Sequence, residues 1–362
     1  MKKILLTGNQ LGTASGIATH LENLISAFHG SDCQFIHFCT GSPISNETKL
    51  GKSLRLFLGP LRFVMVLFRE RPGLVHINTS MDNKGFFRDS IFVALSKVLG
   101  RPVVLQLHAG LEPDDFFLAT KCFLSRFRRM VLKHADVVVL LTQREMEFGK
   151  SFCQYKKLMV VPNAIDSNLA VKPKSISLDA VRLLYIGRLT REKGILQVIE
   201  ALSELKSRGY KNIYLDIAGE GPFENELKQV AEALKLEDEC KFLGLVTGNI
   251  KQLLWEKASL FVFPTYFKEG LPYALLEALA SATPSITTAA GGIPEIIVDK
   301  FNGLIIQPLN MMGVVHAVEF LVKNPEIYSE LSSNALVKAR TEFDLNSLRS
   351  SFQYMYNDIW NI

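Results

Sequence analysis

A chain of 362 residues with 48% hydrophobic and 21% charged residues has the composition of a folded protein rather than a disordered one. The chain is longer than a domain with a single hydrophobic core usually is, which favours two domains. No stretch reaches the roughly 18–20 uninterrupted apolar residues that span a bilayer, and the apolar run after the start is too short for a signal peptide. We therefore expect a cytoplasmic protein.

The charge balance of the two halves and the spacing of the cysteines limit the partners and metal sites that the chain can have. Residues 1–170 hold 21 Lys and Arg against 13 Asp and Glu, whereas residues 171–362 hold 20 against 23. A basic first half indicates an anionic substrate or surface, and on charge alone nucleic acid and anionic lipid both fit. The five cysteines form no C-x-x-C pair, so neither zinc nor a disulfide framework is indicated; they stand at 33, 39, 122, 153 and 240.

Short, almost continuously apolar runs alternate with helical stretches along the chain. Such runs are typical of strands covered on both faces in a parallel sheet. The first half predicts strands at Lys3–Thr7, Cys33–Phe38, Leu74–Ile77, Val103–His108, Asp136–Leu141 and Leu158–Val161. The second half predicts strands at Arg182–Ile186, Ile213–Ala218, Cys240–Leu243, Leu260–Phe263, Pro284–Thr287 and Gly303–Ile306, with helices such as Gly194–Arg208 and Glu224–Leu234.

This repeated alternation predicts two doubly wound, Rossmann-like α/β domains. We place the domains at residues 1–168 and 169–340, with a C-terminal helix over 341–362 that returns to the first domain. The Pro162–Lys174 stretch is the expected linker. Ligands of open α/β sheets bind outside the carboxyl ends of the strands, so the active site is expected in a cleft that the two domains face.

The most informative segment runs from Phe263 through Glu269 to Glu277. It follows an apolar strand, crosses a loop and enters a helix at Pro272, which is favoured in the first helical turn. The N–H groups of such a helix start attract phosphate or sugar hydroxyls. Carboxylates at the loop and in the helix can accept hydrogen bonds from vicinal diols. Two glutamates alone are equally consistent with a solvated residue beside an amphipathic helix.

Further segments give this pair a context. The Glu269–Glu277 spacing resembles the E-x7-E motif of glycosyltransferase family 4, whose members retain anomeric configuration and have the two-domain GT-B fold. Other stretches resemble motifs of that family in the expected order: Val161-Pro-Asn-Ala-Ile-Asp166, Tyr185-Ile-Gly-Arg-Leu-Thr-Arg-Glu-Lys-Gly194, Ala218-Gly-Glu-Gly-Pro222 and Ala289-Ala-Gly-Gly-Ile-Pro-Glu295.

The resemblance assigns roles to individual residues. Arg188 and Lys193 would hold the donor diphosphate, Glu269 the sugar and Glu277 the ribose. Cations and a helix start can neutralise a departing diphosphate without metal, and the chain has no D-x-D pair, so no metal and no cofactor are expected. The other predicted donor contacts are Gly16, Gly187, Val246, Gly270 and Leu271.

In the first half, a small-residue turn with Ser15 and Gly16 follows the first predicted strand. The family usually shows two adjacent glycines there, and Ser15 stands where the first is expected. His108 ends a predicted strand and, by resemblance, contacts the transferred sugar. We also assign His20 and Arg88 to the acceptor. His76 and His134 match no motif and are interpreted as core histidines.

A basic and aromatic pattern covers two stretches of the first half. Arg55, Arg62 and Arg69 stand seven apart, and Gly59-Pro60 predicts two helices there rather than one. The stretch Phe116–Lys133 adds further cations, Arg126, Arg128 and Arg129 among them. Contact with an anionic membrane, peripheral on the inner face of the cytoplasmic membrane, and an ordinary solvated basic face are both consistent with this pattern. No nucleic-acid partner is expected.

The sequence thus predicts a retaining, metal-independent transferase. It would move a sugar, from a UDP-sugar in particular, to a glycan or lipid-linked saccharide in surface polysaccharide or lipopolysaccharide biosynthesis. The alternatives are a sugar-nucleotide epimerase of the same architecture and a catalytically silent scaffold that binds sugar nucleotides or membranes.

Overall fold

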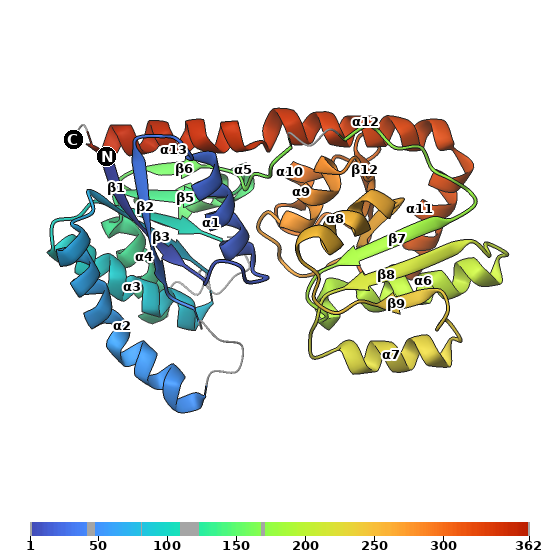
Figure 1. Cartoon of the computed structure of the whole chain (residues 1–362), viewed down its shortest axis with the longest axis horizontal. Helices are drawn as coiled ribbons and strands as arrows, with labels where there is room; N and C mark the ends of the chain where they lie inside the picture. The colour runs from blue at the N-terminus through green and yellow to red at the C-terminus, as the bar shows by residue number, and fades with distance from the viewer. Residues whose placement is uncertain (1, 42–47, 81, 109–122, 168–170, 361–362) are drawn as a thin grey trace. The chain divides into compact units, whose positions relative to one another are not determined.

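The computed structural model describes residues 2–41, 48–80, 82–108, 123–167 and 171–360. The chain divides into two compact units, unit 1 (Met1–Ala164 with Leu345–Ile362) and unit 2 (Ile165–Asp344). Each unit contains one six-stranded parallel sheet with helices between successive strands (Figure 1). The predicted fold class is confirmed. The units divide at Ala164, four residues before the predicted boundary, and the last helix belongs to unit 1.

The sheet of unit 1 has the strand order β2-β1-β3-β4-β5-β6, and every neighbouring pair is parallel. Its strands lie within one or two residues of the predicted ones, because continuous apolar runs such as Val137–Leu140 are buried on both faces. They are β1 Lys2–Gly8, β2 Cys33–Cys39, β3 Leu74–Thr79, β4 Val103–Leu107, β5 Val137–Leu140 and β6 Leu158–Val160.

Helices cover both faces of this sheet. One face carries α1 (Gly16–Ala27) and the C-terminal α13 (Leu345–Trp360), whose apolar side chains share a core cluster with β1. The other carries α2 (Lys49–Glu70), α3 (Asn83–Val98), α4 (Phe123–His134) and α5 (Gln143–Phe152). Local sequence fixes several helix starts. In α5 the Thr142 hydroxyl accepts from the Glu145 N–H, and the Glu145 carboxylate accepts from the Thr142 N–H.

The sheet of unit 2 has the order β12-β11-β10-β7-β8-β9, again parallel throughout. Numbered from its own first strand this is the 3-2-1-4-5-6 order of nucleotide-binding folds read from the other edge. The strands are β7 Val181–Ile186, β8 Ile213–Ala218, β9 Cys240–Phe242, β10 Leu260–Phe263, β11 Ser285–Thr288 and β12 Gly303–Ile306.

The helices of unit 2 connect these strands. Among them α6 packs against α11 and α9 against α12. The helical elements are the 3₁₀ turn η2 Arg191–Lys193, α6 Ile195–Ser207, α7 Glu224–Ala233, α8 Gly248–Lys257, α9 Tyr273–Ala280, α10 Ile293–Ile296, α11 Met311–Lys323 and α12 Pro325–Glu342. Two of them, α6 and α7, lie within one residue of the predicted helices.

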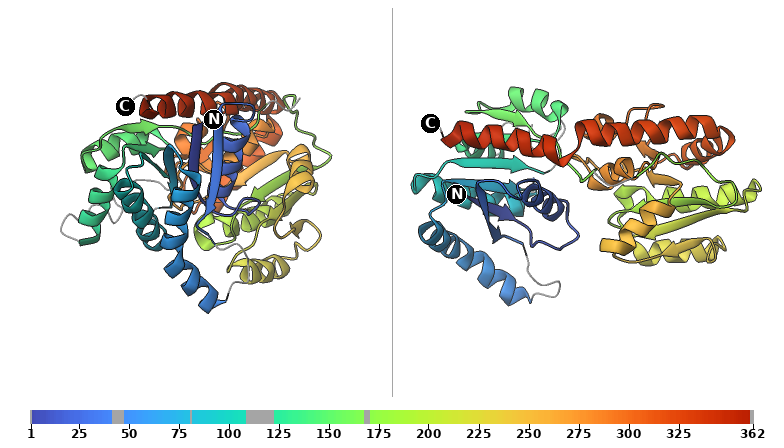
Figure 2. Two further views of the ribbon diagram at one scale, coloured as in Figure 1. Left: turned by 60° about the vertical axis from the view of Figure 1, so that its left-hand side comes forward. Right: turned by 45° about the horizontal axis from the view of Figure 1, so that its top comes forward.

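The prediction of two helices around Gly59-Pro60 is wrong: α2 is a single helix of 22 residues with Pro60 inside it. A proline removes one backbone hydrogen bond and crowds the carbonyl four residues earlier, here that of Leu56. Because Leu56 is 53% exposed, water can hydrate that carbonyl. Figures 1 and 2 show the first half of α2 extending beyond the sheet.

The basic surface predicted on α4 is also smaller than expected. Arg126 is exposed, but Arg128 is 2% exposed, with its guanidinium 5.6 Å from the Phe86 ring centre and donating to Asn83 Oδ1 at 2.5 Å. Arg129 is half-buried over the Phe152 ring. Residues 116–122 of the predicted stretch and the side chain of Arg55 lie outside the described residues.

Hydropathy gives no membrane-spanning element in the part of the chain that the structure describes, where each helix is too short or too polar to cross a bilayer. Four of the five cysteines, at 33, 39, 153 and 240, are described, and each is a free thiol.

Candidate active site

In unit 2 the predicted donor residues gather at one edge of the sheet. The chain leaves β7 towards β8 on one side and later enters β10 on the other side of β7. Connections that diverge in this way open a crevice at the carboxyl ends of the two central strands. Gly187 and Arg188 follow β7, and the loop that carries Glu269 follows β10. The sequence motifs therefore lie at the switch point of the sheet.

A largely buried ion pair joins two of these residues. The Lys193 ammonium donates to Glu269 Oε1, and the two side chains are only 17% and 11% exposed. The Thr265 hydroxyl also donates to Glu269 Oε1, at 3.2 Å. The ammonium lies 4.5 Å from the centre of the Phe267 ring, a cation–π contact that further holds it in place. The two residues that the sequence assigns to diphosphate and sugar thus lie in direct contact.

Glycines make this contact possible. Gly194 closes η2 with φ +74°, and a Cβ on it would lie 2.2 Å from the Pro264 carbonyl oxygen. Gly291 has φ +57°, and its Cβ would lie 2.0 Å from the Glu269 carbonyl oxygen, which accepts the Gly292 N–H at 2.9 Å. Only a residue without a side chain fits such positions. Both glycines therefore bring backbone segments together around the Lys193–Glu269 pair.

Glu277 lies in the middle of α9 and already has two partners. Lys251 Nζ is 2.5 Å from its Oε1, and the Trp255 indole donates to its Oε2 at 3.2 Å. Lys251 and Trp255 are four residues apart on α8 and so share a helix face. A carboxylate has about four acceptor positions, so Glu277 can still accept hydrogen bonds from a ribose diol. Its side chain is 12% exposed.

The remaining predicted donor residues of unit 2 follow the carboxyl ends of strands in the same sheet. Arg188 is exposed, and among the described residues no carboxylate forms an ion pair with it. Gly187 lies in the turn after β7, where Gly219 (φ +140°) approaches its carbonyl oxygen so closely that a Cβ would lie 1.9 Å away. Val246 lies half-buried between β9 and α8. Gly270 and Leu271 precede α9, whose N-cap Pro272 offers no capping side chain.

Unit 1 places its first predicted residues at the carboxyl end of β1. Gly16 begins α1, and Ser15 is the N-cap. The Ser15 hydroxyl accepts the Asn9 side-chain amide at 2.6 Å and does not cap the helix. A Cβ on Gly16 would meet no atom within 4 Å. The first turn of α1 is thus sterically open, as an anion site at a helix start requires.

His108 follows β4, is itself partly exposed, and lies beside the two buried histidines His20 and His76. Its Nε2 is 2.8 Å from Asn78 Oδ1, while the Asn78 amide donates to the Thr7 carbonyl. Because Oδ1 must then accept, His108 carries its proton on Nε2, and Nδ1 is left as an acceptor. Burial, then the neighbouring histidines, lowers the pKa of His108 well below its usual value. The imidazole is therefore neutral at pH 7.

The two other rings are held from several elements. The His20 ring centre lies 4.7 Å from that of His108, and His20 has no exposed surface, so it contacts the site region through His108. His76 lies 2.7 Å from the Tyr356 hydroxyl of α13 and 3.1 Å from Gln106 Oε1. Burial lowers the pKa of His20 to about 4 and that of His76 to about 3. His76 is the core histidine that was predicted. His134 is not, because it is exposed.

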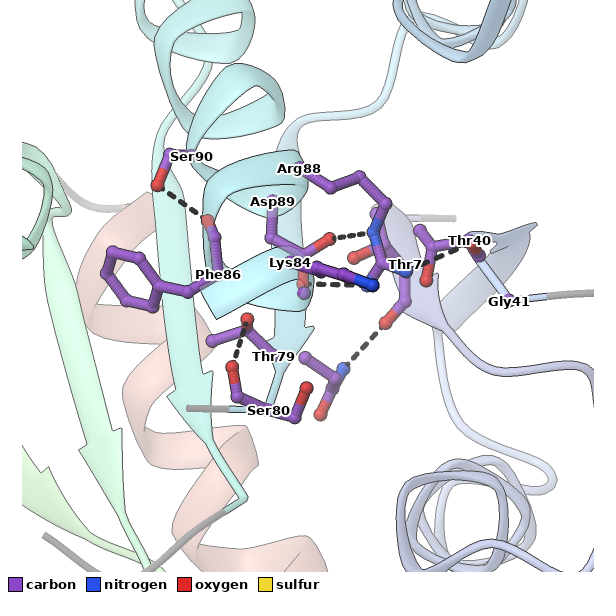
Figure 3. Close-up of polar contacts among 12 residues, drawn as sticks. Thr7, Thr40, Gly41, Thr79, Ser80, Lys84, Phe86, Arg88, Asp89 and Ser90 are labelled. Atoms are coloured by element: carbon purple, nitrogen blue, oxygen red, sulfur yellow. Dashed lines mark hydrogen bonds and ion pairs between the residues drawn. The ribbon is translucent and has the colours of Figure 1, made fainter. Parts of the chain in front are cut away.

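Arg88 lies on α3 and is fixed by its neighbours. Its Nε and Nη2 donate to the two carboxylate oxygens of Asp89 at 2.7 and 2.9 Å, and Nη1 donates to the Thr40 carbonyl at 3.1 Å. Figure 3 shows the guanidinium between Asp89 and Thr40. Asp89 is 1% exposed, and its burial raises the pKa of its carboxyl against the opposing effect of Arg88. Arg88 thus joins the end of β2 to α3.

Sequence reasoning missed several of these partners. Lys251 and Trp255 hold Glu277, Asn78 orients His108, and Thr265 supports Glu269. The four-residue spacing of Lys251 and Trp255 was the one local signal available. Asn78 is the second-last residue of β3, which pairs with β4, the strand that precedes His108; this proximity is visible only once the strand order is known.

Comparison with known families agrees with this arrangement. Residues 14–169 match the model described as Glycosyltransferase Family 4, and residues 168–337 match the model described as Glycosyl transferases group 1. The chain belongs to the glycosyltransferases. An α-D-kanosaminyltransferase of Streptomyces kanamyceticus is 24% identical over 282 residues, which cover 73% of this chain and 72% of that protein.

Solved glycosyltransferases share the whole GT-B fold of this chain. The Alr3699/HepE protein of Anabaena, in complex with UDP-glucose, has a TM-score of 0.77 at 19% identity and covers 99% of this glycosyltransferase and 100% of its own chain. The lipopolysaccharide outer core galactosyltransferase WaaB has a TM-score of 0.68 at 18% identity, and the match covers 98% of this chain and 99% of WaaB. The chain spans 55% and 43% of two further relatives, uncharacterized glycosyltransferases of Haemophilus influenzae and Methanocaldococcus jannaschii.

Proposed function

We propose that this glycosyltransferase transfers a sugar from a UDP-sugar to a glycan or lipid-linked saccharide of a surface polysaccharide, with retention of configuration. The observation that carries the proposal is the largely buried Lys193–Glu269 pair at the switch point of unit 2, with the exposed Arg188 in the turn after β7. UDP-glucose bound to HepE and the lipopolysaccharide galactosyltransferase WaaB support the donor and the pathway, since both share the fold.

The proposed donor site combines charge with hydrogen-bond acceptors. The diphosphate would lie against the Arg188 guanidinium and the Lys193 ammonium, whose present partner, Glu269, can turn to the sugar hydroxyls. Glu277, held by Lys251 and Trp255, would accept the ribose hydroxyls. Charges positioned in a site from which water is excluded stabilise a developing anion without reorganisation. Two cations and the start of α9 then supply the neutralisation that metal-dependent transferases obtain from a divalent ion.

The reaction breaks the bond between the anomeric carbon and the β-phosphate oxygen and forms one between that carbon and the acceptor hydroxyl oxygen. Attack occurs on the face from which the phosphate leaves. The departing phosphate oxygen takes the acceptor proton, so no protein base is needed. The neutral His108, with its Nδ1 as acceptor, would hydrogen-bond a hydroxyl of the transferred sugar. The contribution of the protein is positioning and electrostatics.

Peripheral membrane contact is the second part of the proposal, and it is carried by α2. This helix exposes Phe57, Met65 and Phe68 to 79%, 61% and 65% beside the exposed Arg62 and Arg69. Apolar and cationic side chains on one exposed helix suit an anionic lipid surface. Charge reversal of Arg62 and Arg69 should abolish salt-sensitive flotation with anionic vesicles. Unchanged flotation would refute the contact.

The experiment that tests the function is a panel of nucleotide sugars. Calorimetry with UDP-, GDP-, ADP- and dTDP-sugars, followed by donor hydrolysis in the presence of EDTA, should give micromolar binding and slow hydrolysis for one UDP-sugar. Dependence on a divalent ion would contradict the metal-free mechanism. Conversion of the donor to its epimer without release of UDP would identify an epimerase, and binding without any turnover would identify a scaffold.

A further inference from the structure

An apolar pocket lies in unit 1, apart from the residues assigned to the donor. It has a volume of about 490 Å³ and is enclosed by the end of β2, one side of α2 and the first turns of α3. Its floor is the buried pair Phe38 and Phe92, which pack with Phe63 at ring distances of 4.6–5.6 Å. Ligand pockets have volumes of roughly 300–1,000 Å³. This one is large enough for part of a small amphiphile and too small for a helix.

The wall on α2 contains a gap in its side chains. Gly59 and Pro60 line the pocket, and a Cβ placed on Gly59 would meet no atom within 4 Å. Helix interiors disfavour glycine by about 1 kcal/mol relative to alanine, so Gly59 is costly there, and it leaves the space open. Leu56 and Phe87 stand at the opening with 53% and 56% of their surfaces exposed. The apolar lining thus continues to the protein surface.

The rim of the pocket is cationic. Arg62 and Lys84 line it, both are exposed, and no carboxylate among the described residues forms an ion pair with either of them. The nearby acids are already engaged: Asp89 holds Arg88, and Asp82 accepts from the backbone of Lys84 and Gly85. An apolar cavity with two cations of this kind at its opening is complementary to an anionic head on a hydrocarbon chain.

We propose that this pocket binds the hydrocarbon chain of a lipid phosphate, with its phosphate on Arg62 and Lys84. The position of the pocket connects it to the carboxyl edge of the sheet. Thr40 lines the pocket, accepts from Arg88 and donates its N–H to the Gly8 carbonyl at the end of β1. The lipid phosphate would anchor the acceptor saccharide, and this role rests on the proposed function. Binding of a lipid phosphate in the pocket does not depend on the proposed function.

Affinity for soluble alkyl phosphates below their micelle concentrations measures the pocket directly. A buried methylene contributes about 0.8 kcal/mol, so each added methylene should strengthen binding about fourfold until the pocket is full, after which affinity should level off. Gly59→Leu fills the cavity with a better helix former and should weaken octyl phosphate binding at least tenfold, with an unchanged or higher melting temperature. Gly59→Ala is the small control and should change it far less.

Two further variants separate the sources of binding. Arg62→Gln with Lys84→Gln should weaken octyl phosphate but not octanol. Phe57→Ser, on an exposed part of α2 outside the pocket lining, should leave octyl phosphate binding unchanged. The proposal would be overturned if the affinity for alkyl phosphates did not depend on chain length, or if Gly59→Leu did not change that affinity. So would binding only to phosphatidylglycerol vesicles, lost in Phe57→Ser, because that result describes a membrane surface contact.

The same protein preparation distinguishes this proposal from the proposed function. Donor hydrolysis without chain-length-dependent binding of alkyl phosphates refutes the pocket alone. Saturable alkyl phosphate binding that Gly59→Leu removes, in a protein that neither binds nor hydrolyses any nucleotide sugar, refutes the function alone.

Discussion

Two buried histidines of unit 1, His20 and His76, and the partly exposed His108 make the stability of this unit depend on pH. Burial depresses the pKa of His20 to about 4 and of His76 to about 3, and it lowers that of His108 well below the usual value. The side chains that bond these rings include Tyr356, Gln106 and Asn78, none of which is charged at neutral pH. In the unfolded chain each histidine has a pKa of about 6.5. Acidification therefore protonates the unfolded chain first.

The sign and the size of the pH effect on stability follow from the difference between the folded and unfolded pKa values of these histidines. When the pKa is lowered in the folded state, stability is complete above the unfolded value and falls as pH drops below about 6.5. At pH 5.5 an unfolded histidine has gained most of a proton, which costs about 1.4 kcal/mol for each histidine that stays neutral in the folded state, or about 3–4 kcal/mol for the group. A whole domain is stable by only about 5–15 kcal/mol. Unit 1 should thus lose a large part of its stability between pH 7.5 and pH 5.5.

Urea unfolding at the two pH values measures this loss. Trp360 lies on α13 in unit 1 and Trp255 in unit 2, so a Trp255→Phe background leaves Trp360 as the reporter of unit 1. His76→Gln should reduce the pH-dependent loss by about a third. His134→Gln, on the exposed surface of α4, should leave it unchanged. Equal stability at both pH values, or equal effects of the two substitutions, would refute the reasoning.

Three further substitutions test the local structure. Gly194→Ala should destabilise unit 2 and weaken UDP binding, because its Cβ would lie 2.2 Å from the Pro264 carbonyl oxygen. Gly209→Ala is the control: it also has a positive φ but lies in open space, so it should lower the free energy of unfolding in urea by only about 1–2 kcal/mol. Arg128→Ala should lower the free energy of unfolding by about 2–3 kcal/mol because the guanidinium is buried on Phe86, whereas Arg126→Ala should change it by no more than about 0.5 kcal/mol. Equal changes in the two variants would contradict this difference in burial. Glu277→Gln should weaken UDP about tenfold by calorimetry but leave pyrophosphate, which has no ribose, unaffected; equal losses would remove Glu277 from the ribose.

The fold was predictable from the sequence because its signals are local. Strands buried on both faces appear as uninterrupted apolar runs such as Val137–Leu140, and helix starts contain their own caps, as Thr142 does with Glu145. Glu269 and Lys193 were assigned through the resemblance of two short segments to family motifs, and such motifs are also local. Their direct contact was not predicted, because it depends on β7 and β10 being neighbours.

The misses involve tertiary context. Arg126 and Arg128 are indistinguishable in sequence, and only the packing of α4 against α3 shows that one of them is buried. Pro60 normally ends a helix, but on an exposed helix water can satisfy the carbonyl that it releases. Lys251 reaches Glu277 because α8 and α9 are close in space, and no spacing along the chain records that.

The central claim is that Glu269 and Lys193 act on a sugar nucleotide and do not merely stabilise unit 2. The most direct measurement compares donor hydrolysis and melting temperature in Glu269→Ala, in Lys193→Ala and in a control, Arg191→Ala. Arg191 stands on the same 3₁₀ turn as Lys193 and forms an exposed ion pair with Glu226 of α7. We predict that the first two lower turnover by orders of magnitude in folded protein and that the control retains near-normal turnover. Near-normal turnover in Glu269→Ala or Lys193→Ala would contradict the account.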